Sequence, residues 1–133
     1  MTVENRAARI APYTLSIVRI VVGLLFFEHG TSHLFGYPQA QAQAPVFALS
    51  WFAGIIEFVG GFLLTLGLFA RPAAFIMSGT MAFAYFLAHA PQDLFPILNR
   101  GDAAILYCFI FLYLAVAGPG PWSLDAFLRR SRA

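Results

Sequence analysis

Long apolar stretches separated by short polar segments dominate the pattern of this chain. A helix needs about 20 apolar residues to cross about 30 Å of hydrocarbon, and four stretches approach that length. They predict membrane-spanning helices at about residues 12–32, 47–69, 72–90 and 102–117. Pro12 and Pro72 suit the first turn of a helix, where a missing N–H costs nothing, and the Gly-Pro-Gly-Pro segment at 118–121 ends the last helix.

These elements predict an all-α fold, a membrane-embedded antiparallel four-helix bundle that forms one domain over residues 1–133. The segment 38–45, rich in Gln, Ala and Pro, is expected to be the first external loop. Residues 122–133 are expected to form a short interfacial segment, because the apolar Leu124, Phe127 and Leu128 lie beside Arg129 and Arg130 there. The chain has no internal repeat that would indicate a second unit.

Composition supports a membrane protein and excludes several other classes. Of the 133 residues, 60% are hydrophobic and 11% are charged, whereas soluble domains have about 45–50% and about 25%. The formal net charge of +2 gives no basic surface for nucleic acid. Cys108 is the single cysteine, so neither an intrachain disulfide nor a thiol relay between two cysteines can form.

The arginines are distributed unevenly between the two predicted sides of the membrane. With four spans, both termini and the middle loop share one side. That side holds the arginines at positions 6, 9, 71, 129, 130 and 132, and the other side holds only Arg100. This positive-inside bias predicts a multi-pass protein with both termini in the cytoplasm.

Two ionisable residues, Arg19 and Glu57, lie inside predicted spans. Each costs roughly 2.5–3.5 kcal/mol at a helix centre when it has no partner, so we expect them to pair. The pair would either fix the register of two helices or contact a polar headgroup and relay a proton. Positions 50, 54, 57, 61 and 65 share one helical face, so Glu57 is expected within a packing seam of small residues.

Polar residues gather at the predicted outer ends of the helices. His29 and His33 are four residues apart at the end of the first helix, and His89 ends the third. Three interpretations remain open: a metal site, a quinone or small-molecule pocket, and interfacial groups that satisfy helix ends. A quinone is favoured over a metal or a haem as cofactor, and no catalytic residue is assigned. The candidate ligand-binding residues are Arg19, Glu28, His29, His33, Glu57, Tyr85, His89, Asn99 and Asp102.

An ordered set of motifs between about residues 19 and 125 resembles the DoxX family. The motifs are His29-Gly30-x-x-His33-Leu34-Phe35-Gly36, Glu57-Phe58-Val59-Gly60-Gly61, Leu66-Gly67-Leu68-Phe69-Ala70-Arg71-Pro72-Ala73-Ala74, His89-x-Pro91, Phe95-Pro96-x-x-Asn99-x-Gly101-Asp102 and Gly118-Pro119-Gly120-Pro121-Trp122-Ser123-Leu124-Asp125. The resemblance implies a small bacterial inner-membrane protein with four transmembrane helices. The family commonly has Lys where this chain has His33, and Glu where it has Asp102, so a role that needs a permanent cation at position 33 is not carried over.

Related sequences include subunits of a thiosulfate–quinone oxidoreductase and partners of membrane oxidoreductases linked to oxidative stress. The resemblance therefore implies an accessory component of a quinone-linked redox complex, with the lipid bilayer and other membrane or redox proteins as partners. The alternative is a membrane-protein assembly factor or scaffold without catalytic activity. A proton-coupled transporter is a minor third option, and self-association into a homo-oligomer stays open.

Overall fold

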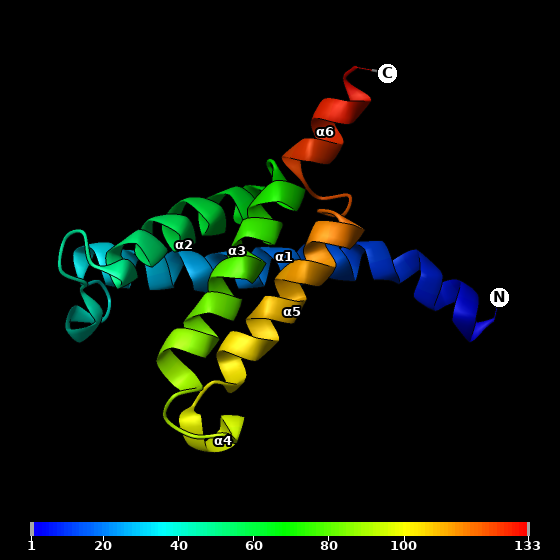
Figure 1. The fold of residues 1–133 in the computed structure, drawn as a ribbon. Coiled ribbons are helices and arrows are strands. Elements are labelled where there is room, and N and C mark those ends of the chain that lie inside the picture. Colours follow the sequence, from blue (N-terminus) through cyan, green and yellow to red (C-terminus); the bar gives the residue numbers. More distant parts are fainter. Residues whose placement is uncertain (1, 133) are drawn as a thin grey trace.

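The computed structural model describes residues 2–132, and every regular element there is helical (Figure 1). This confirms the all-α class. The four main helices are α1 (Val3–Phe35), α2 (Leu49–Leu66), α3 (Ala70–Ala84) and α5 (Asp102–Ala117). Shorter elements connect or follow them: η1 (Ala40–Ala42), η2 (Tyr85–His89), α4 (Pro96–Asn99) and α6 (Leu124–Arg130).

The main helices form two antiparallel hairpins. α1 packs along α2, α3 packs along α5, and the short turn at Gly67 joins α2 to α3. The two hairpins meet near that turn and diverge toward their other ends (Figure 1). Phe26 of α1 links them, because its ring contacts Phe111 and Tyr107 of α5 at centroid distances of 4.5 and 4.8 Å. A closed four-helix bundle is therefore not confirmed.

Glycines let α1 and α2 approach closely. A Cβ atom at Gly30 would collide with the backbone of Phe58, and one at Gly61 would collide with the backbone of Phe27. Close contact of this kind is how helices pack in lipid, where apolar burial gives little driving force. The seam predicted on the Glu57 face of α2 is therefore the surface that meets α1.

Large apolar side chains cover the outside of the molecule as well as its core. Phe26, Leu64, Met77 and Phe111 are buried between the hairpins. Phe83 and Val116, in contrast, are 71% and 73% exposed. Helices α1 and α2 are long and apolar enough to cross a membrane on their own, and α5 is apolar but shorter.

Three boundaries differ from the predicted ones. α1 begins at Val3, because Thr2 caps it by accepting a hydrogen bond from the backbone N–H of Asn5 (3.4 Å), so Pro12 lies inside the helix and not in its first turn. α2 is shorter than predicted, because Gly67 ends it in the left-handed conformation at φ +68°. α3 begins at Ala70, which places Pro72 in the first turn as predicted, and continues into the π-helical η2.

The segment 118–125 closes the end of the molecule at which the hairpins meet. Arg19 is 1% exposed and donates through Nη1 to the carbonyl of Pro119 (2.6 Å) and through Nη2 to that of Trp122 (2.7 Å). Its Nε has no partner among residues 2–132. The predicted Arg19–Glu57 pair is therefore wrong: α1 directs Arg19 to the chain after α5, whose non-helical carbonyls need donors inside the fold.

Asp125 fixes the same segment to the start of α3. Its carboxylate accepts hydrogen bonds from the backbone N–H groups of Phe69 and Ala70, each at 3.0 Å, and its own N–H donates to the carbonyl of Gly67 (2.9 Å). An acidic side chain there satisfies free N–H groups and favours the positive end of the helix dipole. We call Arg19, Asp125 and the segment 118–125 the C-terminal clasp. α6 follows it with Ser123 as N-cap, so the helical part of the predicted interfacial segment is Leu124–Arg130.

Candidate functional site

A cavity of about 1040 Å³ lies where the two hairpins diverge. Its size matches the upper end of known small-molecule pockets, which span about 300–1,000 Å³. α1 and α2 form one wall, and α3, η2 and α5 form the other. Most of the lining is apolar, and the ionisable side chains in it are His29, His33, Glu57, His89, Arg100 and Tyr107. We call this cavity the histidine pocket.

His33 and Glu57 form an ion pair across the α1–α2 seam. Nδ1 of His33 lies 2.7 Å from Oε2 of Glu57, and the two side chains are 27% and 5% exposed. Gly54 makes room for the pair, since a Cβ atom there would lie 2.8 Å from Cβ of His33. It is the only ion pair among residues 2–132. Glu57 thus has a partner from α1, as the sequence predicts, but the partner is His33.

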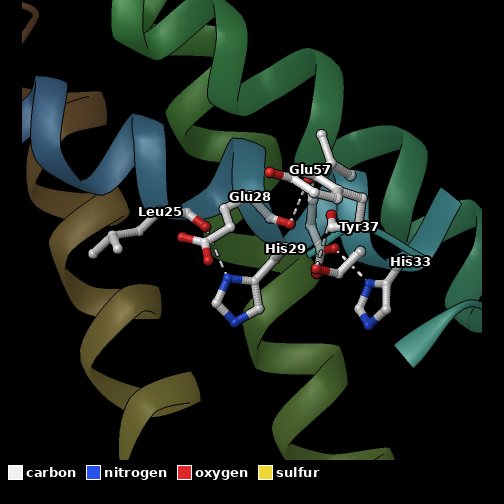
Figure 2. Close-up of polar contacts among 8 residues, drawn as sticks. Leu25, Glu28, His29, His33, Tyr37 and Glu57 are labelled. Carbon is white, nitrogen blue, oxygen red and sulfur yellow. Dashed lines mark hydrogen bonds and ion pairs between the residues drawn. The ribbon is translucent and has the colours of Figure 1, made fainter. Parts of the chain in front are cut away.

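The other two histidines are oriented by backbone carbonyls. Nδ1 of His29 lies 2.8 Å from the carbonyl of Leu25, and Nδ1 of His89 lies 2.9 Å from that of Asn99. A carbonyl only accepts, so each Nδ1 carries a proton, and Nε2 is an acceptor when the ring carries no second proton. No Nε2 of the three histidines has a hydrogen bond within residues 2–132. Figure 2 shows His29 and His33 on the same side of α1, with the second ring nitrogen pointing away from the helix.

Two of the ionisable lining residues, Arg100 and Tyr107, were not among the predicted site residues. Arg100 is the left-handed C-cap of α4, and Tyr107 packs its ring against Phe26. Ala104 and Tyr107 are three residues apart on α5 and both line the histidine pocket. That helical spacing is visible in the sequence and could have identified Tyr107, whereas Arg100 lies before α5 and has no such signal.

Tyr85 and Asn99 do not line the pocket, but they lie next to residues that do. Asn99 is fully buried, donates to the carbonyl of Asp93 (2.9 Å) and to the hydroxyl of Tyr85 (3.4 Å), and accepts from the N–H of Gly101 (2.8 Å). These bonds fix the turn between η2 and α5. Because the carbonyl of Asn99 binds His89, the turn also orients that imidazole.

The remaining predicted site residues lie outside the pocket. Glu28 and Asp102 are exposed and do not line it, and Arg19 belongs to the C-terminal clasp. Among residues 2–132 there is no group of three His, Cys, Asp or Glu side chains that could hold a metal ion. The pocket can therefore offer hydrogen-bond donors and acceptors to the polar groups of a ligand, and imidazoles that can donate or accept a proton.

Comparison with known proteins confirms the resemblance found in the sequence. The DoxX family model matches residues 14–90, a range that includes the three histidines and Glu57. A Haemophilus influenzae protein described as uncharacterized is 42% identical over 130 residues, covering 91% of this chain and 95% of its own length. No solved structure matches the chain.

Two further relatives carry names that mention membranes. The inner membrane protein YqjF of Escherichia coli is 25% identical over 126 residues, which is 86% of this chain and 91% of the relative. The uncharacterized membrane protein Rv3486 of Mycobacterium tuberculosis is 31% identical over 134 residues, which is 86% of this chain and 80% of the relative.

Proposed function

This chain belongs to the DoxX family of membrane proteins, and we propose that it binds a quinone in the histidine pocket as an accessory subunit of a membrane redox complex. The observation that supports this most is the meeting of three imidazoles and the His33–Glu57 pair at one largely apolar cavity. Quinones have the matching chemistry, with polar oxygens on a ring and an apolar tail.

The proposal includes a multi-pass orientation in the bacterial inner membrane. α1, α2, α3 with η2, and α5 would be the four spans, and both termini would lie in the cytoplasm. The distribution of arginines supports this orientation, because six lie at the clasp side and Arg100 lies at the pocket side. The histidine pocket would then open near the outer face of the membrane, and the C-terminal clasp would lie near the cytoplasm.

The residues of the pocket have separate parts in this proposal. His29 and His89, whose Nε2 atoms act as acceptors, would accept hydrogen bonds from the hydroxyl groups of the reduced quinol, because a quinone carbonyl oxygen can only accept. Glu57 favours a protonated His33, whose Nε2–H would then donate to a polar oxygen. Arg100 would add a permanent cation. A bound quinone supplies reversible two-electron chemistry, while these side chains bind it, orient it and exchange protons with its oxygens.

Binding of a short-tailed quinone to the protein in lipid nanodiscs tests the proposal. Decylubiquinone should bind saturably to the wild-type protein. Glu57→Gln should weaken the affinity for this quinone about tenfold, since a hydrogen bond to a charged group contributes about 1.5–3 kcal/mol. His29→Leu should weaken the affinity for the reduced form, decylubiquinol, whose hydroxyl groups can donate to Nε2.

Glu28→Gln is the matched control, because Glu28 is an exposed carboxylate on the same helix that does not line the pocket. The affinity of Glu28→Gln for decylubiquinone should stay within about twofold of the wild-type affinity. Absence of saturable binding to the wild-type protein, or equal losses in Glu57→Gln and Glu28→Gln, would reject the quinone site.

The scaffold alternative rested on the glycine-rich seams. Gly30, Gly54 and Gly61 are occupied by contacts between α1 and α2, so they do not supply a free docking surface. Recovery of a stoichiometric partner by crosslinking in native membranes, together with no quinone binding, would favour the scaffold.

A further inference from the structure

A second cavity, of about 630 Å³, lies at the clasp end of the molecule. It is an open cavity lined by the N-terminal half of α1, the end of α5 and α6, with Pro12, Leu15 and Ala126 among its apolar residues. The cavity is separate from the histidine pocket, because the two share no lining residue.

Three arginines from two distant parts of the chain line this cavity: Arg71 from α3, and Arg129 and Arg130 from α6. No Asp or Glu is among the lining residues. Within residues 2–132, none of the three arginines forms an ion pair with a carboxylate, and Arg129 and Arg130 form no side-chain hydrogen bond there. The cavity therefore holds a concentration of positive charge without an anion from the protein.

Hydrogen bonds fix the position of Arg71, and part of its guanidinium group still has unused N–H donors. Its Nη1 donates to the carbonyls of Ala115 (3.1 Å) and Val116 at the end of α5. Gly118 leaves room for the guanidinium, since a Cβ atom there would lie 2.9 Å from Nη2 of Arg71. A guanidinium has five N–H donors, so Nε and Nη2 stay available to a ligand.

We propose that this cavity binds the phosphate of an anionic phospholipid from the neighbouring leaflet. A phosphate offers several oxygens to guanidinium groups, which recognise it with paired hydrogen bonds. The apolar alanines, prolines and Leu15 in the cavity wall suit an acyl chain, which inorganic phosphate lacks. Basic pockets beside transmembrane helices bind acidic lipid headgroups in this way.

Lipid enrichment measures this directly on the full-length protein. The protein is reconstituted in mixed phosphatidylcholine and phosphatidylglycerol vesicles and extracted in mild detergent, and the retained lipids are quantified by mass spectrometry. The wild-type protein should retain phosphatidylglycerol in excess of the vesicle composition. Arg129→Gln with Arg130→Gln should reduce this enrichment about tenfold or more, since each arginine near the membrane surface contributes about fivefold.

Arg6→Gln with Arg132→Gln is the matched control. It removes the same charge from the same predicted side of the membrane, at two residues that do not line the cavity, and should keep most of the enrichment. Equal loss in both double variants would show general charge attraction and overturn the site. Thermal unfolding of each variant verifies that the compared proteins are folded.

Inorganic phosphate, added during extraction, tests whether the cavity binds a phospholipid or free phosphate. The lipid should stay bound, and displacement by phosphate at a concentration that leaves other lipids in place would overturn the lipid assignment. Extracted protein exposes both ends to solution, so the result depends neither on the orientation in the membrane nor on quinone binding.

Discussion

The clasp end and the pocket end each bury one ionisable side chain, but they use it differently. Arg19 is 1% exposed, and both of its Nη groups donate to carbonyls of the chain after α5. Glu57 is also buried, yet its partner His33 lines a large cavity together with two more histidines. Both residues lie within predicted membrane spans, where an ionisable side chain commonly indicates function.

The two ends differ in whether the polar groups around the buried side chain still have unused hydrogen-bonding capacity beside a cavity. Around Arg19, hydrogen bonds join the buried side chain to the backbone, and Arg19 itself lines neither of the two cavities. Around Glu57, the Nε2 atoms of three histidines have no partner among residues 2–132. A buried charge therefore indicates a binding site only when its surroundings keep both space and hydrogen-bonding capacity. Arg19 holds the fold, and Glu57 belongs to the proposed site.

The largest expected effect is at Arg19. Arg19→Met removes both donors and leaves the carbonyls of Pro119 and Trp122 buried, which should lower the free energy of unfolding by about 3 kcal/mol or more. Arg19→Lys keeps the charge but cannot bind both carbonyls as a fork, so its loss should be smaller. Equilibrium unfolding in mixed detergent measures both. Wild-type stability of Arg19→Met would contradict the clasp.

Overpacking the α1–α2 seam should come next. A Cβ at Gly30 meets the backbone of Phe58, which cannot move aside as a flexible side chain can. Gly30→Ala should therefore cost about 1–3 kcal/mol. Gly79→Ala is the control on α3, because a Cβ at Gly79 meets nothing within 4 Å, and it should be neutral or stabilise by up to about 1 kcal/mol. Equal losses in the same unfolding assay would refute the close seam.

Removal of the Asp125 cap should have a more moderate effect. Asp125→Ala leaves the N–H groups of Phe69 and Ala70 without their side-chain acceptor and should cost about 0.5–2 kcal/mol. Asp125→Asn keeps one acceptor oxygen, so it should retain part of that free energy. Hydrogen exchange at the start of α3 should accelerate in Asp125→Ala. Unchanged exchange there would show that the cap does not hold this end.

Glu57→Gln should have the smallest effect on stability and a large effect on ligand binding. The amide oxygen of Gln can still accept a hydrogen bond from Nδ1 of His33, so we expect a loss of about 1 kcal/mol or less. Glu57→Gln should therefore weaken quinone binding while it leaves the protein nearly as stable as wild type. Arg19→Met, in contrast, should mainly lower the stability. A loss as large as that of Arg19→Met would make Glu57 a structural pin as well.

The sequence predicts the all-helical class, the α5 bounds and the family, because long apolar runs and ordered motifs are local signals. It also predicts the seam on the Glu57 face of α2, since helical periodicity decides which residues share a face. The histidines at the ends of α1 and η2 were expected to lie together, and they line one cavity.

Long-range contacts decide the parts that were not predicted. The free-energy cost of an unpaired charge inside a membrane span favoured Arg19 and Glu57 as partners. The sequence does not reveal that the segment 118–125 folds back onto α1 and brings backbone carbonyls to Arg19. The divergence of the hairpins likewise depends on packing between helices that are distant in the chain. Arg100 and Tyr107 were missed because an exterior arginine and one of many aromatic residues are ordinary at a membrane boundary.

Ligand-induced stabilisation is the most direct test of the division between the two ends. A ligand that binds only the folded state raises the free energy of unfolding by an amount set by its concentration and affinity. Decylubiquinone should stabilise the wild-type protein and Arg19→Lys by the same increment, although Arg19→Lys starts from a lower stability. Glu57→Gln should start near wild type and gain much less. An increment that disappears in Arg19→Lys and persists in Glu57→Gln would contradict the account.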